Sequence, residues 1–456
     1  MKISFLKFLL LLMLAITVIS PVAFASEGEG VHNYATTFLF IAIILMMAKL
    51  SSLIERVGQP AVLGELLIGV ILGNMVLLGI NFFEPIKENP IIIFLAELGV
   101  VILLFQIGLE SNIQKMKAVG FRAFLVASVG VIAPFILGTY LVGPWLMPGL
   151  NFSAYLFIGA TLTATSVGIT ARVFRDLNKL QTREAQIVLG AAVIDDVLGL
   201  IILAVVSAIV TVGSVGIGLI TLITAKAILF LVGSIIIGQI AAPRLGKLFA
   251  KINTGTGMKF TLAISFGLIF AFLAQKIGLA PIIGAFAAGL VLDPVHFRYF
   301  KDANIVKDLK ENVKNSDEVT RKKILGILEP HADRHIEDLI EPLGLFLVPI
   351  FFVVTGMGVS LSTLANLPVL LVALGITVAA FIGKIVSGLV AGKVNKAVVG
   401  FGMIPRGEVG LIFAMTGKSL NVISDQVFSA IVIMVIITTL LTPPILTYLL
   451  KRKKLD

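Results

Sequence analysis

The clearest pattern in this sequence is a succession of long apolar runs separated by short polar segments. Each run is about 20 residues long, the length at which an α-helix crosses the hydrocarbon core of a bilayer. The runs are continuous rather than alternating, which excludes a transmembrane β-barrel with its alternating strands of about ten residues. We predict about thirteen spans, near residues 33–52, 60–80, 91–109, 119–142, 150–174, 184–211, 215–241, 258–276, 280–293, 342–360, 366–391, 397–418 and 426–450.

The first 25 residues have the features of a secretory signal. Lys2 and Lys7 precede an apolar stretch, Pro21 breaks it, and Ala23-Phe-Ala25 supplies small residues for cleavage. We predict a cleaved signal peptide over residues 1–25, with an uncleaved extra helix as the alternative. Either way, the next segment begins outside the cell.

Basic side chains give an independent test of this orientation, because cytoplasmic loops hold the excess of Lys and Arg. Thirteen crossings that start outside end inside, and residues 451–456 then form a cytoplasmic tail. The outer loops contain only Lys87, Lys276 and Lys418. The inner loops contain Arg56, Lys115, Lys117, Arg122, Arg172, Arg175, Lys179, Arg183, Arg244, Lys247, Lys251, Lys259, Lys393 and Lys396. We therefore expect a multi-pass protein of the plasma membrane.

The composition agrees with this topology and excludes several classes of function. Hydrophobic residues make up 58% of the 456, charged residues only 14%, and the net charge is +10. A soluble globular protein is excluded, since such domains are about one quarter charged. The basic residues follow topology and are not interleaved with aromatics, so no nucleic-acid partner is expected. The absence of cysteine excludes disulfides, thiolate metal sites and thiol nucleophiles.

Two related halves are visible in the chain. Leu53 to Gly58 reappears as Leu273 to Gly278, 220 residues later. Other matches pair Gly64 with Gly284, Gly69 with Gly289, Gly108 with Gly358, and 166–169 with 408–411. One unpaired span, 215–241, lies between the halves, and an odd separator inverts the second half. Unless these glycine-rich matches arise by chance, the sequence predicts inverted-topology repeats, an architecture of many secondary transporters.

Two spans carry signals of interruption at mid-depth. Span 150–174 contains the hydroxyl-rich run Thr161 to Thr170, which includes Thr163, Thr165 and Ser166. Span 397–418 contains Pro405 among several glycines. Hydroxyls can satisfy the backbone groups that a break releases. We predict two crossing discontinuous helices whose half-helix ends and free carbonyls meet where a cation can bind.

Ionisable side chains inside the membrane are costly and therefore indicate function. Asp195 and Asp196 are flanked by apolar residues in the middle of span 184–211. Adjacent helix positions diverge by about 100°, so one acid can coordinate an ion while the other pairs with a base. Lys384, also at mid-span, is the expected base. Arg406 and Glu408 lie in the second break, where they can pair with each other and compensate helix termini.

Other polar residues carry weaker signals. Glu65 and Glu97 lie nearer span ends, where hydrogen bonding or exposure explains them, and Lys226 in the unpaired span has no acid nearby in sequence. Residues 297–341 form a long polar inner loop, which is either a linker or regulatory. Its His331 and His335 have helical spacing for metal ligands but lack a third ligand.

This inventory suits the exchange of ions better than catalysis. Carboxylates, hydroxyls and carbonyls are hard ligands for a small dehydrated cation, and buried acids also hold protons. A site that holds either kind of ion supports antiport by alternating access. No phosphate-binding loop is visible. We therefore expect a transporter rather than an enzyme, with Na⁺ or Li⁺ and H⁺ as transported ions and no cofactor.

From about Tyr34 to Leu450, the chain resembles the monovalent cation:proton antiporters, specifically the sodium/proton branch with paired aspartates (NapA/NhaA-like). The resemblance rests on the motifs 164–172, 190–199, 383–384 and 405–411. It implies that Asp196 is the principal Na⁺ ligand, assisted by Asp195, which alternately bridges Lys384. It also implies that Thr165 lies beside the ion, with Thr163, Ser166, Arg406 and Glu408 supporting the crossing.

The resemblance also implies a homodimer in which an ion-transport core moves against a dimerisation domain. The core would comprise 119–211 and 366–450. The dimerisation helices would comprise 26–118, 243–296 and 342–365, with a linker helix over 212–242. Relatives with Asn in place of the first acid are typically electroneutral, so Asp195 implies electrogenic exchange. Asn74, where relatives often have proline, and the long loop 297–341 depart from the family pattern.

Three other functions remain open at this point. A potassium/proton exchanger or potassium-efflux system shares much of the motif set. A sodium-coupled carrier of organic solutes could use a similar fold. An intramembrane aspartyl protease also needs two buried aspartates, but these must face each other from different helices, unlike the adjacent Asp195 and Asp196.

Overall fold

The computed structural model describes residues 34–57, 60–110, 120–212, 217–292, 300, 335–364 and 367–452. Within these ranges every regular element is a helix. Nine of the helices are long and apolar enough to cross a membrane, and three further apolar helices are shorter. This confirms an all-α polytopic membrane protein. The predicted signal peptide, His331 and the side chain of His335 lie outside the described part.

The helices follow the predicted spans in order. The first half contains α2 (Tyr34–Ser51), α3 (Ala61–Gly73), α5 (Pro90–Glu110), α7 (Gly120–Ile136), the pair α9 (Phe152–Thr161) and α10 (Val167–Asp176), and α11 (Arg183–Val212). After α12 (Ile217–Ile252), the second half contains α13 (Thr256–Lys276), α14 (Pro281–Val291), α17 (His335–Met357), α19 (Leu367–Ile385), the pair α20 (Lys396–Gly402) and α21 (Glu408–Ser419), and α22 (Asp425–Arg452).

Short elements complete these spans. They are η1 (Ser52–Val57), η2 (Met75–Leu78), α4 (Glu84–Glu88), the π-helical turn η3 (Leu137–Val142), α8 (Gly143–Leu146), α18 (Leu361–Leu364) and η6 (Val386–Val390). Each half therefore supplies six spans in the same order, with α12 between them.

Glycine contacts confirm that the halves are related. A Cβ atom on Gly69 of α3 would lie 2.2 Å from the carbonyl oxygen of Val353 in α17. One on Gly289 of α14 would lie 2.2 Å from the carbonyl oxygen of Phe105 in α5. The same close helix contact thus occurs twice, with the roles of the two halves exchanged, as an inverted repeat requires.

In the structure, one of the predicted residue matches between the two halves is shifted by two residues. The α-carbon of Gly356 lies 2.9 Å from the Cβ position of Gly69, and the carbonyl carbon of Gly108 lies 2.9 Å from the Cβ position of Gly289. Gly108 therefore corresponds to Gly356 rather than to Gly358. Loops of different length hide such a shift from the sequence alone.

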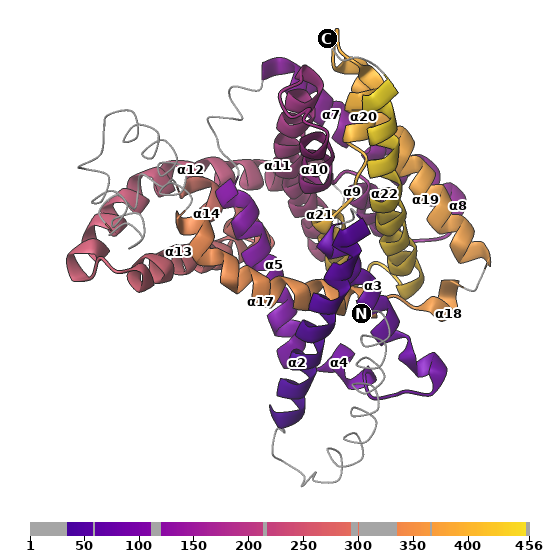
Figure 1. Ribbon diagram of the computed structural model, residues 1–456. Helices are drawn as coiled ribbons and strands as arrows, with labels where there is room; N and C mark the ends of the chain where they lie inside the picture. The colour runs from indigo at the N-terminus through magenta and orange to yellow at the C-terminus, as the bar shows by residue number, and fades with distance from the viewer. Residues whose placement is uncertain are drawn as a thin grey trace.

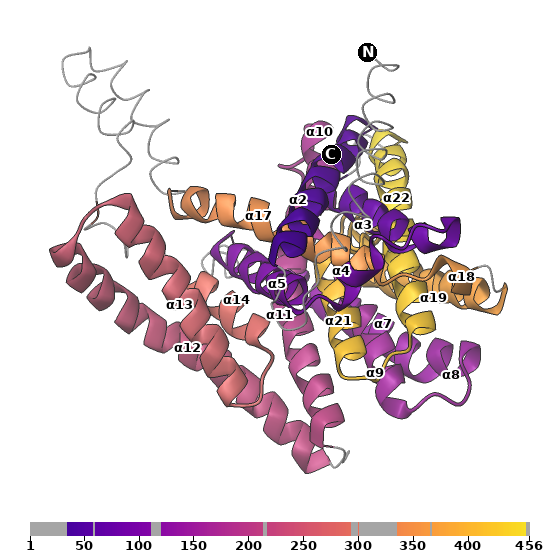
Figure 2. The ribbon, with the colours of Figure 1, turned by 90° about the horizontal axis from the view of Figure 1, so that it is seen from below.

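The long helices pack in two groups. One, here the flank group, consists of α2, α3, α5, α13, α14 and α17; the other, the crossing group, consists of α7, α9, α10, α11, α19, α20, α21 and α22. The helix α12 packs against α11 of the crossing group and α14 of the flank group. Figure 1 shows most of the crossing group on the right and α12 to α14 on the left. In Figure 2, α12 and α13 run along one edge, with α19 and α8 at the opposite edge.

Two helix boundaries differ from the prediction. The helix α12 continues to Ile252, past the predicted end at 241 and through Pro243. The helix α17 begins at His335, inside the segment predicted as loop. There Ile336 and Ile340, spaced by four, are both buried. Hydropathy locates the membrane-embedded part of a helix, whereas amphipathic turns extend beyond it.

Candidate ion-binding site

The two discontinuous helices meet at their breaks. Five residues separate α9 from α10, and five separate α20 from α21. The backbone N–H of Ser166 in the first break donates to the carbonyl oxygen of Pro405 in the second, at 2.7 Å. A Cβ atom on Gly407 would lie only 2.7 Å from the Cβ of Ser166, so glycine permits this approach. The predicted crossing of two broken helices is confirmed.

Threonine hydroxyls bind carbonyl oxygens that the breaks release. Thr165 Oγ1 donates to the carbonyl oxygen of Met403 at 3.1 Å, and Thr170 Oγ1 donates to that of Gly402 at 2.7 Å. Thr163 Oγ1 donates to the carbonyl oxygen of Ala160 within its own helix end, at 2.7 Å. Without such partners, the last carbonyls of a helix end would be unsatisfied in an apolar interior.

Arg406 links the second break to the first break and to α19 through hydrogen bonds. Its guanidinium is fully buried and donates to the carbonyl oxygen of Ala164 in the first break and, at 3.2 Å, to that of Ala380 in α19. Thr439 of α22 donates its hydroxyl to the carbonyl oxygen of Arg406 at 2.6 Å. A positive charge beside the C-terminal end of α9 interacts favourably with the negative end of that helix dipole. The side chain of Glu408, the predicted partner of Arg406, lies outside the described part.

Asp195 and Lys384 form an ion pair between α11 and α19. Lys384 Nζ donates to Asp195 Oδ1 at 2.8 Å, and neither side chain is accessible to solvent. Gly130 of α7 lies beside the ammonium group, with its Cβ position 3.6 Å from Nζ. The second carboxylate oxygen, Asp195 Oδ2, is buried and has no hydrogen-bond partner among the residues that the structure describes. The pair is desolvated, and breaking it would leave a buried charge uncompensated.

Asp196 occupies a different environment from its neighbour. It is half-buried, whereas Asp195 is only 1% exposed. Its charge nevertheless acts on Lys384, which also interacts with Asp195 and Arg406. Thr165, at the crossing, interacts with the Asp195 carboxylate. The arrangement thus joins two carboxylates of unequal exposure, a threonine hydroxyl and the carbonyl oxygens of two helix breaks.

The remaining candidates lie elsewhere. Glu65 lines a cavity of about 450 Å³ within the flank group, together with Lys49, Glu55, Gln106 and Glu341. Glu97 and Lys226 are exposed on α5 and α12. In the described ranges no group of three or more His, Cys, Asp and Glu side chains could hold a metal ion.

Sequence reasoning missed several polar residues that shape the site. Glu184 is 7% exposed and accepts the backbone N–H of Asn395, the N-cap of α20, at 2.9 Å. Thr439, which binds Arg406, is 4% exposed. The hydroxyl run Thr438-Thr439 within an apolar span was an available signal for the second residue. Glu184 offered none, because an acid in a first helical turn is common on protein surfaces.

Comparison with known proteins places the chain among ion transporters. Residues 39–452 match the family described as "Sodium/hydrogen exchanger, transmembrane". The chain is 35% identical to the high-affinity Na⁺/H⁺ antiporter NhaS3 of Synechocystis, over 90% of this chain and 89% of that protein. It is 32% identical to the Na⁺/H⁺-K⁺ antiporter GerN of Bacillus cereus, over 90% and 95%.

The fold also matches a solved structure. The sodium proton antiporter MjNhaP1 from Methanocaldococcus jannaschii at pH 8 superimposes with a TM-score of 0.60, at 18% identity, over 90% of this chain and 95% of that one. Since the family match spans almost all of the described helices and two relatives exceed 30% identity along nearly their whole length, this chain belongs to the sodium/hydrogen exchanger family, a family of transporters rather than enzymes.

Proposed function

We propose that this protein exchanges Na⁺ or Li⁺ for H⁺ across the plasma membrane. The observation that carries the proposal is the buried Asp195–Lys384 pair beside the partly accessible Asp196 at the helix crossing. A carboxylate in such a place binds either a proton or a small cation, because both satisfy the same negative charge. The names of the relatives, which are Na⁺/H⁺ antiporters, support the same pair of ions.

In this proposal Asp196 is the principal ligand of Na⁺, and Asp195 and Thr165 assist it. Asp195 alternates between Lys384 and the cation. Thr163, Ser166, Arg406 and Glu408 support the crossing. Oxygen atoms of carboxylates, a hydroxyl and released carbonyls form the hard ligand set that Na⁺ requires. Transport needs no cofactor, since the gradients of the two ions supply the free energy.

We propose further that exchange is electrogenic and that the protein belongs to the NapA/NhaA-like branch with paired aspartates. With Asp195 paired to Lys384 and Asp196 next to it in the chain, more than one proton can be released for each Na⁺ bound. Transport would then move net charge and respond to membrane potential. Electroneutral exchange in reconstituted vesicles would contradict this part of the proposal alone.

Potassium is the second candidate cation. One of the relatives, GerN, is named for both Na⁺ and K⁺, and its sequence is 32% identical. Na⁺, Li⁺ and K⁺ should therefore be compared side by side. The cavity around Glu65 lies in the flank group, away from the crossing.

The packing of the long helices in two separate groups is compatible with different roles for the two groups in transport. We propose that the flank group contains the dimerisation domain of a homodimer and that the crossing group is the moving core. The N-terminus after signal cleavage would lie outside and the C-terminus in the cytoplasm. Native mass spectrometry of the detergent-solubilised protein tests the dimer directly, and a monomer at all lipid contents would contradict it.

Everted membrane vesicles provide the test of the main proposal. Adding Na⁺ or Li⁺ to vesicles with a preformed proton gradient should dissipate the gradient when the parent protein is present. Asp196→Asn should abolish this response, and Lys226→Gln, an exposed residue on α12, is the matched control that should retain it. An undiminished response of Asp196→Asn would refute the assignment.

A further inference from the structure

The two helix groups are joined along the chain by a short segment between α17 and α18. Only residues 358–360 separate the last residue of α17, in the flank group, from the first residue of α18, which packs on α19 and α22 of the crossing group. A movement of one group against the other must change the conformation of this segment or its contacts, as it must at the other connections between the groups. Its hydrogen bonds are therefore informative about the movement that transport requires.

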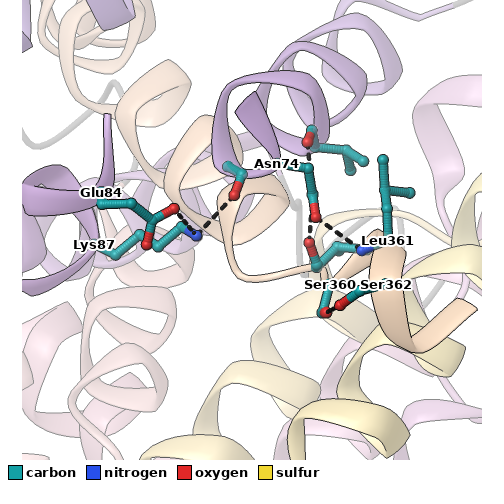
Figure 3. A network of polar contacts seen from close by, with 9 residues as sticks. Asn74, Glu84, Lys87, Ser360, Leu361 and Ser362 are labelled. Atoms are coloured by element: carbon teal, nitrogen blue, oxygen red, sulfur yellow. Dashed lines mark hydrogen bonds and ion pairs between the residues drawn. The ribbon is translucent and has the colours of Figure 1, made fainter. Parts of the chain in front are cut away.

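Asn74 binds this segment from the flank side. It is the C-cap residue of α3, and its Nδ2 donates to the carbonyl oxygens of Val70, at 2.8 Å, and Val359, at 2.7 Å. Its Oδ1 accepts the backbone N–H of Leu361 at 2.8 Å. The side-chain amide thus holds the backbone on both sides of Ser360, as Figure 3 shows. A side-chain amide has two N–H donors and one acceptor oxygen, so it can make all three hydrogen bonds at once.

The end of α3 that carries Asn74 is itself held in place. Lys87 of α4 donates to the carbonyl oxygen of Gly73 at 2.7 Å and is paired with Glu84 at the same distance (Figure 3). A Cβ atom on Gly73 would lie 2.4 Å from the carbonyl oxygen of Met357, so α3 also packs directly on the last turn of α17. Asn74 therefore extends from a rigid support.

The same segment contacts the crossing group from the other side. The backbone N–H of Ser360 donates to Oγ of Ser429 in α22 at 3.1 Å, and Ser429 is fully buried. A Cβ atom on Gly358 would lie 3.1 Å from the ring of Phe428. Ser360 thus lies between Asn74 of one group and Ser429 of the other.

We propose that Asn74 is a positioning residue for transport: it clamps residues 359–361 to the flank group and so keeps the junction with α22 closed in this conformation. The clamp fixes the point from which the crossing group can move. Asn74 touches no ion ligand and acts through Ser360 and Ser429. The transport part of this inference rests on the proposed function, whereas closure of the junction can be tested without it.

A cysteine at position 355 reports on the junction. Thr355 is fully buried, its hydroxyl has no hydrogen-bond partner among the described residues, and it lies one turn before Gly358, which directly follows α17. The chain contains no native cysteine, so Thr355→Cys supplies a single thiol of similar size. In the purified protein, Asn74→Leu should raise the rate of maleimide labelling about tenfold, because two hydrogen bonds that close the junction are lost.

Asn89 offers the matched control. It is an amide at the same end of the flank group, with hydrogen bonds to Thr37, Ile91 and Ile92, all within that group. Asn89→Leu should leave the labelling rate unchanged, although it too removes hydrogen bonds. Ser429→Ala should also raise the labelling rate, because it removes the hydrogen bond that Ser360 makes to the crossing group. If Asn74→Leu does not fold, the Ser429→Ala variant tests the clamp in its place. Equal labelling in the parent and Ser429→Ala, or equal increases in Asn74→Leu and Asn89→Leu, would overturn the clamp.

Transport kinetics distinguish positioning from general support. In proteoliposomes, Asn74→Leu should lower the maximal rate of exchange about tenfold, with the half-saturating Na⁺ concentration within about twofold of the parent's, since the ion ligands keep their neighbours. Asn74→Asp, which can still accept from Leu361 but cannot donate to Val359, should fall between. Exchange by the parent with no change in these variants would refute the clamp alone. Absence of exchange in the parent would refute the proposed function, and the labelling result would still decide the clamp.

Discussion

At the scale of single residues, the site depends on the different environments of two adjacent acids. Asp195 and Asp196 differ by about 100° around α11; the first is sealed against Lys384, and the second is half-buried. One acid thereby has a counter-charge in contact, while in the proposed function the other remains accessible to an ion. This arrangement follows from helix geometry alone once Lys384 is placed on a neighbouring helix.

The buried pair leads to a stability prediction. Lys384→Met should lower the free energy of unfolding by about 3–5 kcal/mol, because Asp195 would remain buried without a counter-charge. Adding Asp195→Leu should recover most of that loss, since the double variant buries neither charge. Thermal unfolding of the detergent-solubilised variants measures both effects. Additive losses in the double variant would show that the pair is not coupled.

At this scale, the sequence singled out residues that are costly inside a membrane, and the structure brings four of them close together. Asp195, Asp196, Lys384 and Arg406 could be selected because charges within apolar spans are expensive. The contacts of Asn74 and Glu184 could not be predicted from the sequence, because polar residues are common at the ends of spans. Their partners, Val359 and Asn395, lie more than 200 residues away in sequence, and only the fold brings them together.

At the scale of elements, the fold depends on helices whose backbones touch. Gly69 against Val353 and Gly289 against Phe105 let α3 reach α17 and α14 reach α5 without intervening side chains. In a membrane, where lipid is as apolar as the side chains, such close packing contributes much of the association between helices. The repeated glycines therefore serve both as evidence of the repeat and as a physical requirement of it.

A pair of alanine substitutions tests this requirement. Gly69→Ala should lower the thermal unfolding temperature markedly, because its Cβ would lie 2.2 Å from a backbone carbonyl oxygen that cannot move aside. Gly233→Ala in α12 is the control, since no described atom outside its own helix backbone lies within 4 Å of its Cβ position. It should be neutral or slightly stabilising, because alanine favours helix by up to about 1 kcal/mol. Similar melting of both variants would contradict the packing argument.

The breaks were the most predictable elements and the helix ends the least. Hydroxyls in one span and proline with glycines in another signalled interruptions, and the breaks occur at 162–166 and 403–407. The ends of α12 and α17 were misplaced because hydropathy reports on burial in lipid. A helix continues beyond the lipid wherever its turns find partners, as Ile336 and Ile340 do.

At the scale of the whole molecule, the inverted repeat sets the orientation of every span. With α12 as an odd separator, the two halves enter the membrane from opposite sides, which brings the breaks of both halves to one crossing. The positive-inside rule then assigns the sides. The relation between the halves was visible in the sequence, but the division into flank and crossing groups emerges only from the packing.

Single cysteines can test this orientation, because the chain has none of its own. Gln426 and Lys393 are both exposed, and the predicted topology puts them on opposite sides of the membrane. In intact cells, a membrane-impermeant maleimide should label Gln426→Cys and leave Lys393→Cys unlabelled until the membrane is opened. The reverse pattern would require the whole topology to be inverted.

The central claim is that Na⁺ and protons compete for the carboxylates at the crossing. Measuring Na⁺ binding to the purified protein by calorimetry over a range of pH tests it most directly. Below the pH at which the site takes up protons, the apparent dissociation constant for Na⁺ should rise at least tenfold for each unit fall in pH, as linkage to one or more protons requires. Asp196→Asn should abolish the binding. A dissociation constant that stays constant with pH, or is unchanged by Asp196→Asn, would contradict the account.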